Sequence, residues 1–179
     1  AAARATLAGL GERILRLTDP EARDVLMDGP GDLTVQVGVG PRVLARNPAV
    51  AGLADMPLYT GDAELPAVAL GGDLLLMIQA SNPGVLEPVF EALVAPGSGI
   101  TVQWREHGAR GPSQDMIARN PLGFHDGIIN PRGEDEYAEQ VWIPDGPLAG
   151  GTICAIRRFV LATREFSQLA PPRQDAVIG

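Results

Sequence analysis

The sequence predicts an α+β fold in which helices cover one face of an antiparallel sheet. Three observations lead to it: apolar residues at helical spacing near the N-terminus, two short apolar strands far apart in the chain, and a second helix followed by a third strand. The elements occur in the order helix, strand, strand, helix, strand. One further strand in front would complete the β-α-β-β-α-β order of the split βαβ, or ferredoxin-like, arrangement.

The first helix and the first two strands are predicted from periodicity. Residues 3–17 place apolar side chains on one helical face, and Pro20 ends this helix because proline disfavours the helical conformation of the residue before it. Residues 33–39 alternate apolar with small or polar side chains, as a half-buried strand does. Residues 73–80 are apolar enough to lie in the centre of the sheet.

A second helix and a third strand follow. Asn82 before Pro83 is typical of a helix start, with asparagine as N-cap and proline at the first helical position. We expect the helix to run to Leu93, with Pro88 near the first turn, where a missing N–H costs least. Residues 100–106 then predict the third strand.

The second half of the chain has fewer regular patterns. We expect a solvated loop at residues 134–136, a short piece around residues 141–142 and a clear strand at residues 151–161. The chain turns helical from Thr163 onward. A strand followed by a helix is how a second, similar unit would begin.

These elements predict three parts. Residues 1–115 form an N-terminal ferredoxin-like domain whose first strand is missing, and residues 116–150 form a loop region. Residues 151–179 form the truncated start of a second ferredoxin-like domain.

Composition excludes some classes of function. The chain has 14 basic and 22 acidic residues and a net charge of −8, which argues against nucleic acid as a partner. No apolar run approaches the ~20 residues of a membrane helix, so we expect no membrane span. Cys154 is the only cysteine, which excludes a disulfide within the chain. No signal sequence is present, which leaves a cytoplasmic protein or a trimmed, exported one.

The loop at residues 120–131 is the candidate site. It sets Asp126 between Gly123 and Gly127, and its apolar neighbours are Phe124, Ile128 and Ile129. Glycines let backbone approach a ligand, and a carboxylate among apolar side chains is costly to bury unless something uses it. We expect these neighbours to exclude water and raise the pKa of Asp126 towards values useful for a general base. The alternative is an Asx-turn aspartate that makes only local hydrogen bonds.

Other chemistries find little support in the sequence. His125 beside Asp126 is the only local cluster of metal-ligating type, and adjacent residues rarely point the same way, so we expect no metal site of these two residues. Cys154 lies within an apolar run and is a poor candidate for a nucleophile. No Gly-Lys-Ser/Thr phosphate loop is present.

The motifs of this loop resemble one family. Residues 123–127 match the G-x-x-D-G signature of the dye-decolourising haem peroxidases, and three further landmarks occur in the family's order: Gly71-Gly72-Asp73-Leu74, Arg119-Asn120-Pro121-Leu122, and Gly150-Gly151-Thr152 leading to Arg157-Arg158. The resemblance implies two ferredoxin-like halves of the dimeric α+β barrel type. It also implies haem b, bound at the second half.

The resemblance further implies an activity and a set of site residues. The enzyme would reduce hydrogen peroxide and oxidise aromatic or dye-like small molecules. Asp126 would be the distal acid/base that helps peroxide deprotonate and cleave. The residues expected to bind haem are Phe124, Gly127, Ile128, Ile129, Asn130 and Arg157.

The axial histidine and distal arginine of the family are expected outside this chain, because neither His107 nor His125 matches the axial position. We therefore expect an incomplete chain, oligomeric or completed by a second polypeptide or copy. Two alternatives remain open. One is a non-catalytic fragment that serves as a binding or assembly module, and the other is a deferrochelatase-like branch that releases iron from haem.

Overall fold

The computed structural model describes residues 2–21, 23–45, 50, 53–65, 71–109, 118–127 and 129–178. They form two compact units, Ala1–Arg105 and Glu106–Gly179. Each unit is described by itself below. The predicted three-part division at residues 115 and 150 stays a prediction.

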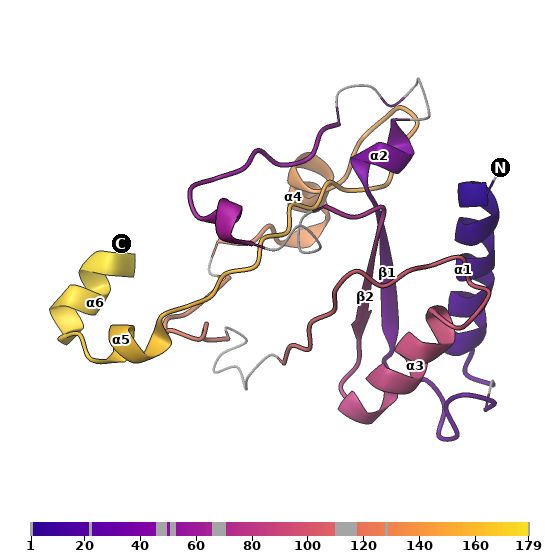
Figure 1. Cartoon of the computed structure of the whole chain (residues 1–179), viewed down its shortest axis with the longest axis horizontal. Coiled ribbons are helices and arrows are strands. Elements are labelled where there is room, and N and C mark those ends of the chain that lie inside the picture. Colours follow the sequence, from indigo (N-terminus) through magenta and orange to yellow (C-terminus); the bar gives the residue numbers. More distant parts are fainter. Residues whose placement is uncertain are drawn as a thin grey trace. The chain divides into compact units, whose positions relative to one another are not determined.

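The first unit contains an antiparallel pair of strands (Figure 1). Strand β1 (Thr34–Val39) pairs with β2 (Leu74–Gln79), with Thr34 opposite Gln79 and Val39 opposite Leu74. Both predicted strands are confirmed to within one residue at each end. Because opposite residues share a face, this register gathers Val35 of β1 with Leu76 and Ile78 of β2.

Two helices cover that face. Helices α1 (Ala2–Thr18) and α3 (Leu86–Leu93) contribute the most deeply buried side chains of the core. They pack with the core face of the sheet into one apolar cluster, whose buried members are Leu10, Leu17, Leu26, Leu33, Val89 and Leu93. The order α1-β1-β2-α3 confirms the α+β, ferredoxin-like class.

Helix α3 begins as its sequence predicts. Asn82 Oδ1 accepts a hydrogen bond of 2.9 Å from the N–H of Gly84, and a 3-10 turn (Pro83–Val85) leads directly into α3. Pro88 lies in the first turn of α3, where its missing N–H breaks no helical hydrogen bond. Two further short elements, α2 (Pro41–Leu44) and a 3-10 turn (Asp62–Glu64), lie in the stretch between the strands.

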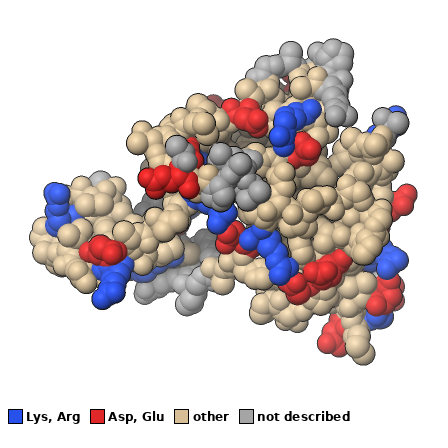
Figure 2. Space-filling model, in the orientation of Figure 1, with Lys and Arg blue, Asp and Glu red and all other residues tan. Residues whose placement is uncertain are grey.

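Charged side chains of the first unit form exposed ion pairs. Arg16 contacts Asp24 at 2.6 Å and Arg42 contacts Asp73 at 3.2 Å. On the face shown in Figure 2, acidic and basic side chains lie interspersed rather than gathered by sign. Exposed pairs of this kind contribute little to stability.

Asp32 joins the loop before β1 to Ser81, the second residue after β2. Its carboxylate accepts hydrogen bonds from the hydroxyl and the backbone N–H of Ser81, the latter at 2.9 Å. The hydroxyl bond and then the N–H bond hold the pKa of Asp32 below its ordinary value of 3.8. The contact therefore stabilises the fold above that ordinary pKa, and its contribution is lost as pH falls through the lowered pKa.

An acid titration of stability tests this contact. We expect the urea midpoint of the wild type to fall more steeply than that of Asp32→Asn between about pH 5 and pH 2, because asparagine does not titrate. Ser81→Ala serves as the control and should reduce the difference. Parallel pH profiles for the wild type and Asp32→Asn would contradict the assignment.

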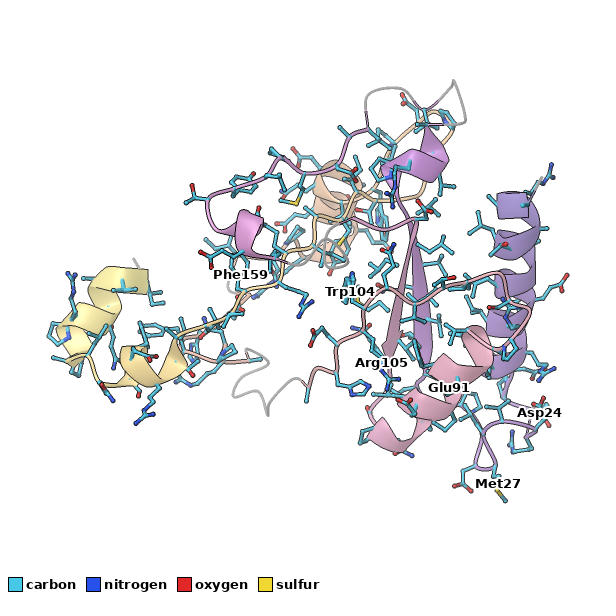
Figure 3. The ribbon with its side chains drawn as sticks, in the orientation of Figure 1. Asp24, Met27, Glu91, Trp104, Arg105 and Phe159 are labelled. Carbon is cyan, nitrogen blue, oxygen red and sulfur yellow. The ribbon has the colours of Figure 1, made fainter. Side chains whose placement is uncertain are left out.

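The prediction of a third strand at residues 100–106 is wrong. Residues 101–109 have no regular secondary structure, and Val102 is exposed. A strand forms only where neighbouring backbone accepts and donates its hydrogen bonds, and within the described residues β1 and β2 pair with each other alone. Arg105 holds the end of this segment against α3, 2.8 Å from Glu87 and with its guanidinium 5.1 Å from the Phe90 ring centroid (Figure 3).

Among its described residues, the second unit contains three helices: α4 (Gly133–Gln140), α5 (Thr163–Ser167) and α6 (Pro171–Ile178). The helix predicted from Thr163 is confirmed. The Gln174 side-chain amide ties the last two together, because it donates to the carbonyls of Phe166 and Leu169.

Helix α4 corrects the predicted loop at residues 134–136. These residues form its first turn, where acidic side chains interact favourably with the positive end of the helix dipole. Glu136 also accepts a 2.6 Å hydrogen bond from the backbone N–H of Arg132. Residues 141–142 form the turn that ends α4, since both of their N–H groups donate to the carbonyl of Tyr137.

The predicted strand at residues 151–161 is also wrong. This segment has no regular secondary structure, and every residue in it is exposed, including Ile153, Phe159 and Val160. Figure 3 labels Phe159 on the segment, which leads into α5. β-Branched composition makes a segment suited to a sheet, but pairing needs a partner strand. Among the described helices, none is both long and apolar enough to cross a membrane.

Candidate functional site

The candidate site is a small hydrogen-bonded hairpin in the second unit, which we call the Asp126 hairpin (residues 118–126). The N–H of Asp126 donates to the carbonyl of Ala118 at 2.9 Å, and the N–H of Asn120 donates to the carbonyl of Phe124 at 2.8 Å. Arg119 and His125 lie opposite each other in an antiparallel bridge between these bonds. The G-x-x-D-G motif is therefore one arm of a paired turn.

Side chains close this turn. Asn120 Oδ1 accepts hydrogen bonds from the N–H groups of Leu122 at 3.0 Å and Phe124 at 3.1 Å. The guanidinium of Arg119 donates to the carbonyl of Gly123. The hairpin thus holds its shape through its own residues.

Both glycines of the motif have positive φ. Gly123 lies at φ 90° and Gly127 at φ 81°, in the region that L side chains rarely adopt. A Cβ at Gly127 would also lie 2.7 Å from Asn130 Nδ2, whereas nothing lies within 4 Å of one at Gly123. The backbone conformation, with close packing at Gly127, explains why glycine occupies these two positions.

Asp126 is exposed, so the expected burial among apolar neighbours is wrong. Those neighbours turn elsewhere: Ile129 is 97% exposed, and the ring of Phe124 packs edge-on against Phe166 of α5, with 6.0 Å between ring centroids. Ile128, another of the predicted haem contacts, lies outside the described residues. The carboxylate of Asp126 is thus open to small molecules.

An open pocket of about 330 Å³ lies just after the hairpin. Two predicted site residues, Ile129 and Asn130, line it, and Asp126 does not. The other lining residues lie within α4 and in the segment before it: Pro131, Arg132, Glu136 and Gln140. None of these four is predicted from the sequence, because residues 134–136 are expected there to form a loop. Helical spacing of Arg132, Glu136 and Gln140 was the signal that could have found them.

The predicted Arg157 lies apart from this pocket lining. Its guanidinium stands 5.0 Å from the ring centroid of Phe159. The neighbouring Arg158 forms a 2.6 Å ion pair with Glu106. Both arginines lie in the exposed segment at residues 151–161, and neither lines the pocket.

Comparison with known families decides the family. The model described as Dyp-type peroxidase, N-terminal, matches residues 2–110, and the model described as Dyp-type peroxidase, C-terminal, matches residues 117–179. The chain belongs to the Dyp-type, or dye-decolourising, peroxidase family. A dye-decolorizing peroxidase of Thermobifida fusca (strain YX) is 30% identical in an alignment of 167 positions that covers 84% of this chain and 39% of that relative. No solved structure matches the chain.

The haem implied by the Dyp-type family needs apolar contacts, groups for its propionates and a ligand for its iron. Phe124 and Ile129 provide apolar surface, and Arg157 provides a guanidinium suited to a carboxylate. His107 and His125 are exposed and neither lines the pocket. Among the residues described, no three His, Cys, Asp or Glu side chains are grouped to hold a metal ion. Side chains of the kinds that border a haem are therefore present, but of Phe124, Ile129 and Arg157 only Ile129 lines the pocket.

Proposed function

We propose that this chain is part of a haem-dependent peroxidase that reduces hydrogen peroxide and oxidises aromatic or dye-like molecules. Family membership supports the reaction class. The observation that carries the role of this chain is the Asp126 hairpin, which presents one exposed carboxylate at a fixed place between two glycines of positive φ. A small, polar substrate can reach that carboxylate directly.

Asp126 acts on the protons of peroxide. An ionised carboxylate oxygen accepts the proton of one peroxide oxygen, and the protonated carboxyl returns it to the departing oxygen, which leaves as water. The hairpin holds the backbone of Asp126 while this happens. A bound haem would supply the redox-active iron that reduces peroxide by two electrons and then oxidises the aromatic substrate one electron at a time.

Several residues around the hairpin are proposed to hold haem. Ile129 and Asn130 border the pocket after the hairpin, and they would lie along the porphyrin edge together with the backbone of Gly127. Phe124 offers its ring, and Arg157 would pair with a propionate. Ile128 belongs to the same proposal from the sequence alone.

The iron ligand is proposed to come from outside residues 1–179. The chain spans only 39% of the length of its Thermobifida fusca relative. Residues 151–161 support an interface with further polypeptide, because they expose Ile153, Phe159 and Val160 outside any regular secondary structure. Exposed apolar segments of this kind mark interaction surfaces.

Haem titration tests the proposal. We expect the Soret band to remain that of free haem when haem is added to the 179-residue chain alone. A sharpened and shifted Soret band should appear when the chain is fused to the part of the Thermobifida fusca relative that lies outside the matched region. Absence of this change in both samples would favour the non-catalytic binding module. Release of iron with an intact porphyrin would favour the deferrochelatase-like activity.

A further inference from the structure

We propose that Asn120 is a positioning residue: its side-chain amide fixes the hairpin that holds Asp126 in place. The inference rests on the proposed role of Asp126 and names the residue through which that role is maintained. Asn120 itself lies at the opposite end of the hairpin from Asp126 and need not touch a substrate.

Asn120 makes more hydrogen bonds within the hairpin than any other residue described there. Its Oδ1 accepts from Leu122 and Phe124, its N–H donates to the carbonyl of Phe124, and its carbonyl accepts from Gly123 at 2.9 Å. A single amide oxygen with two lone pairs can accept both N–H groups at once. This residue therefore closes the turn from both its side chain and its backbone.

The residue after Asn120 strengthens this arrangement. Pro121 has no N–H, so it cannot compete for Oδ1, and its ring fixes φ near −65°. Oδ1 therefore accepts its hydrogen bonds from the next available N–H groups, those of Leu122 and Phe124. Asn120 is also half-buried, which keeps these bonds partly shielded from water.

The pairing register of the hairpin connects the turn at Asn120 to the backbone position of Asp126. The bond between Asn120 and the Phe124 carbonyl sets the bridge of Arg119 with His125, and that bridge sets Asp126 against Ala118. In paired backbone, a slip of one residue turns each side chain to the other face. Loosening the turn at Asn120 would therefore change the direction in which the Asp126 carboxylate points.

Amide hydrogen exchange of the 179-residue chain tests the proposal without haem. Asn120→Ala should speed exchange of the N–H groups of Phe124 and Asp126 about tenfold, because the turn loses its side-chain acceptor. Asn120→Asp retains an acceptor oxygen and should restore slow exchange. Unchanged exchange at Asp126 in Asn120→Ala, or failure of Asn120→Asp to restore it, would overturn the proposal.

A matched control separates this role from a general effect of losing an asparagine. Asn82 also accepts a backbone N–H through Oδ1, that of Gly84 in the first unit. Asn82→Ala should leave exchange at Asp126 unchanged. Exchange in α4 reports whether the second unit of each Asn120 variant has folded, exchange in β1 and β2 reports the same for the first unit of Asn82→Ala, and Asn120→Ser provides a milder substitution if Asn120→Ala unfolds.

Peroxide kinetics of the haem-loaded fusion then separate the two proposals. Asn120→Ala should lower kcat more than it raises KM, and Asn120→Asp should recover most of the loss. If Asp126→Asn retains full peroxide turnover, the proposed role of Asp126 is wrong. The exchange experiment tests the role of Asn120 in the hairpin separately, because it needs neither haem nor peroxide.

Discussion

Replacing Asp126 with asparagine is expected to lower kcat/KM for hydrogen peroxide by about 10²–10⁴-fold in the haem-loaded fusion. Asparagine has nearly the same shape as aspartate, so the hairpin is retained, but its neutral amide does not accept the proton that peroxide must lose. The Asp126 N–H bond to Ala118 is made by the backbone and survives the substitution. Steady-state peroxide kinetics measure the effect.

Asp135→Asn is the matched control for this experiment. Asp135 is an exposed carboxylate in the first turn of α4, in the same unit, so its substitution changes charge equally without touching the hairpin. It should leave kcat/KM within about twofold of wild type. Equal turnover by Asp126→Asn and Asp135→Asn would remove Asp126 from the mechanism.

Replacing Leu93 with alanine is expected to destabilise the first unit by about 2–5 kcal/mol. Leu93 is 0% exposed and lies in the core between α1, α3 and the sheet, so truncation removes packed methyl groups and leaves a cavity. Urea unfolding followed by Trp104 fluorescence, in a Trp142→Phe background, measures this unit alone.

Leu15→Ala is the control for the core substitution. Leu15 lies on α1 but is 72% exposed, so the same truncation removes little packing. We expect its effect to stay within about 0.5 kcal/mol. Similar losses for the two variants would mean that α3 does not pack on the core as described.

Prediction from sequence succeeded where a pattern needed only its own residues. The period of α1, the apolar runs of β1 and β2, and the Asn82-Pro83 start of α3 all reflect local preferences, and the structure confirms them. Helix α4 was missed because its acidic residues make no apolar stripe. Its start depends on the bond between Glu136 and the Arg132 backbone, which composition does not reveal.

The same limit appears at the candidate site. The two glycines and the aspartate were identified from the motif, and the structure adds that Gly123 and Gly127 have the positive φ that glycine allows. The burial of Asp126 was predicted wrongly because apolar neighbours in sequence do not determine where their side chains turn. Phe124 turns towards Phe166, which lies far along the chain.

The sequence by itself determined the family, the α+β order of the first unit and the carboxylate of the proposed site. Only the tertiary structure decided that residues 100–106 and 151–161 form no regular secondary structure, that Asp126 is exposed, and that Asn120 closes its hairpin. The physical reason is the same in each case. Helical period and glycine conformation are properties of a short segment, whereas strand pairing, burial and hydrogen-bond closure depend on which other residues come close.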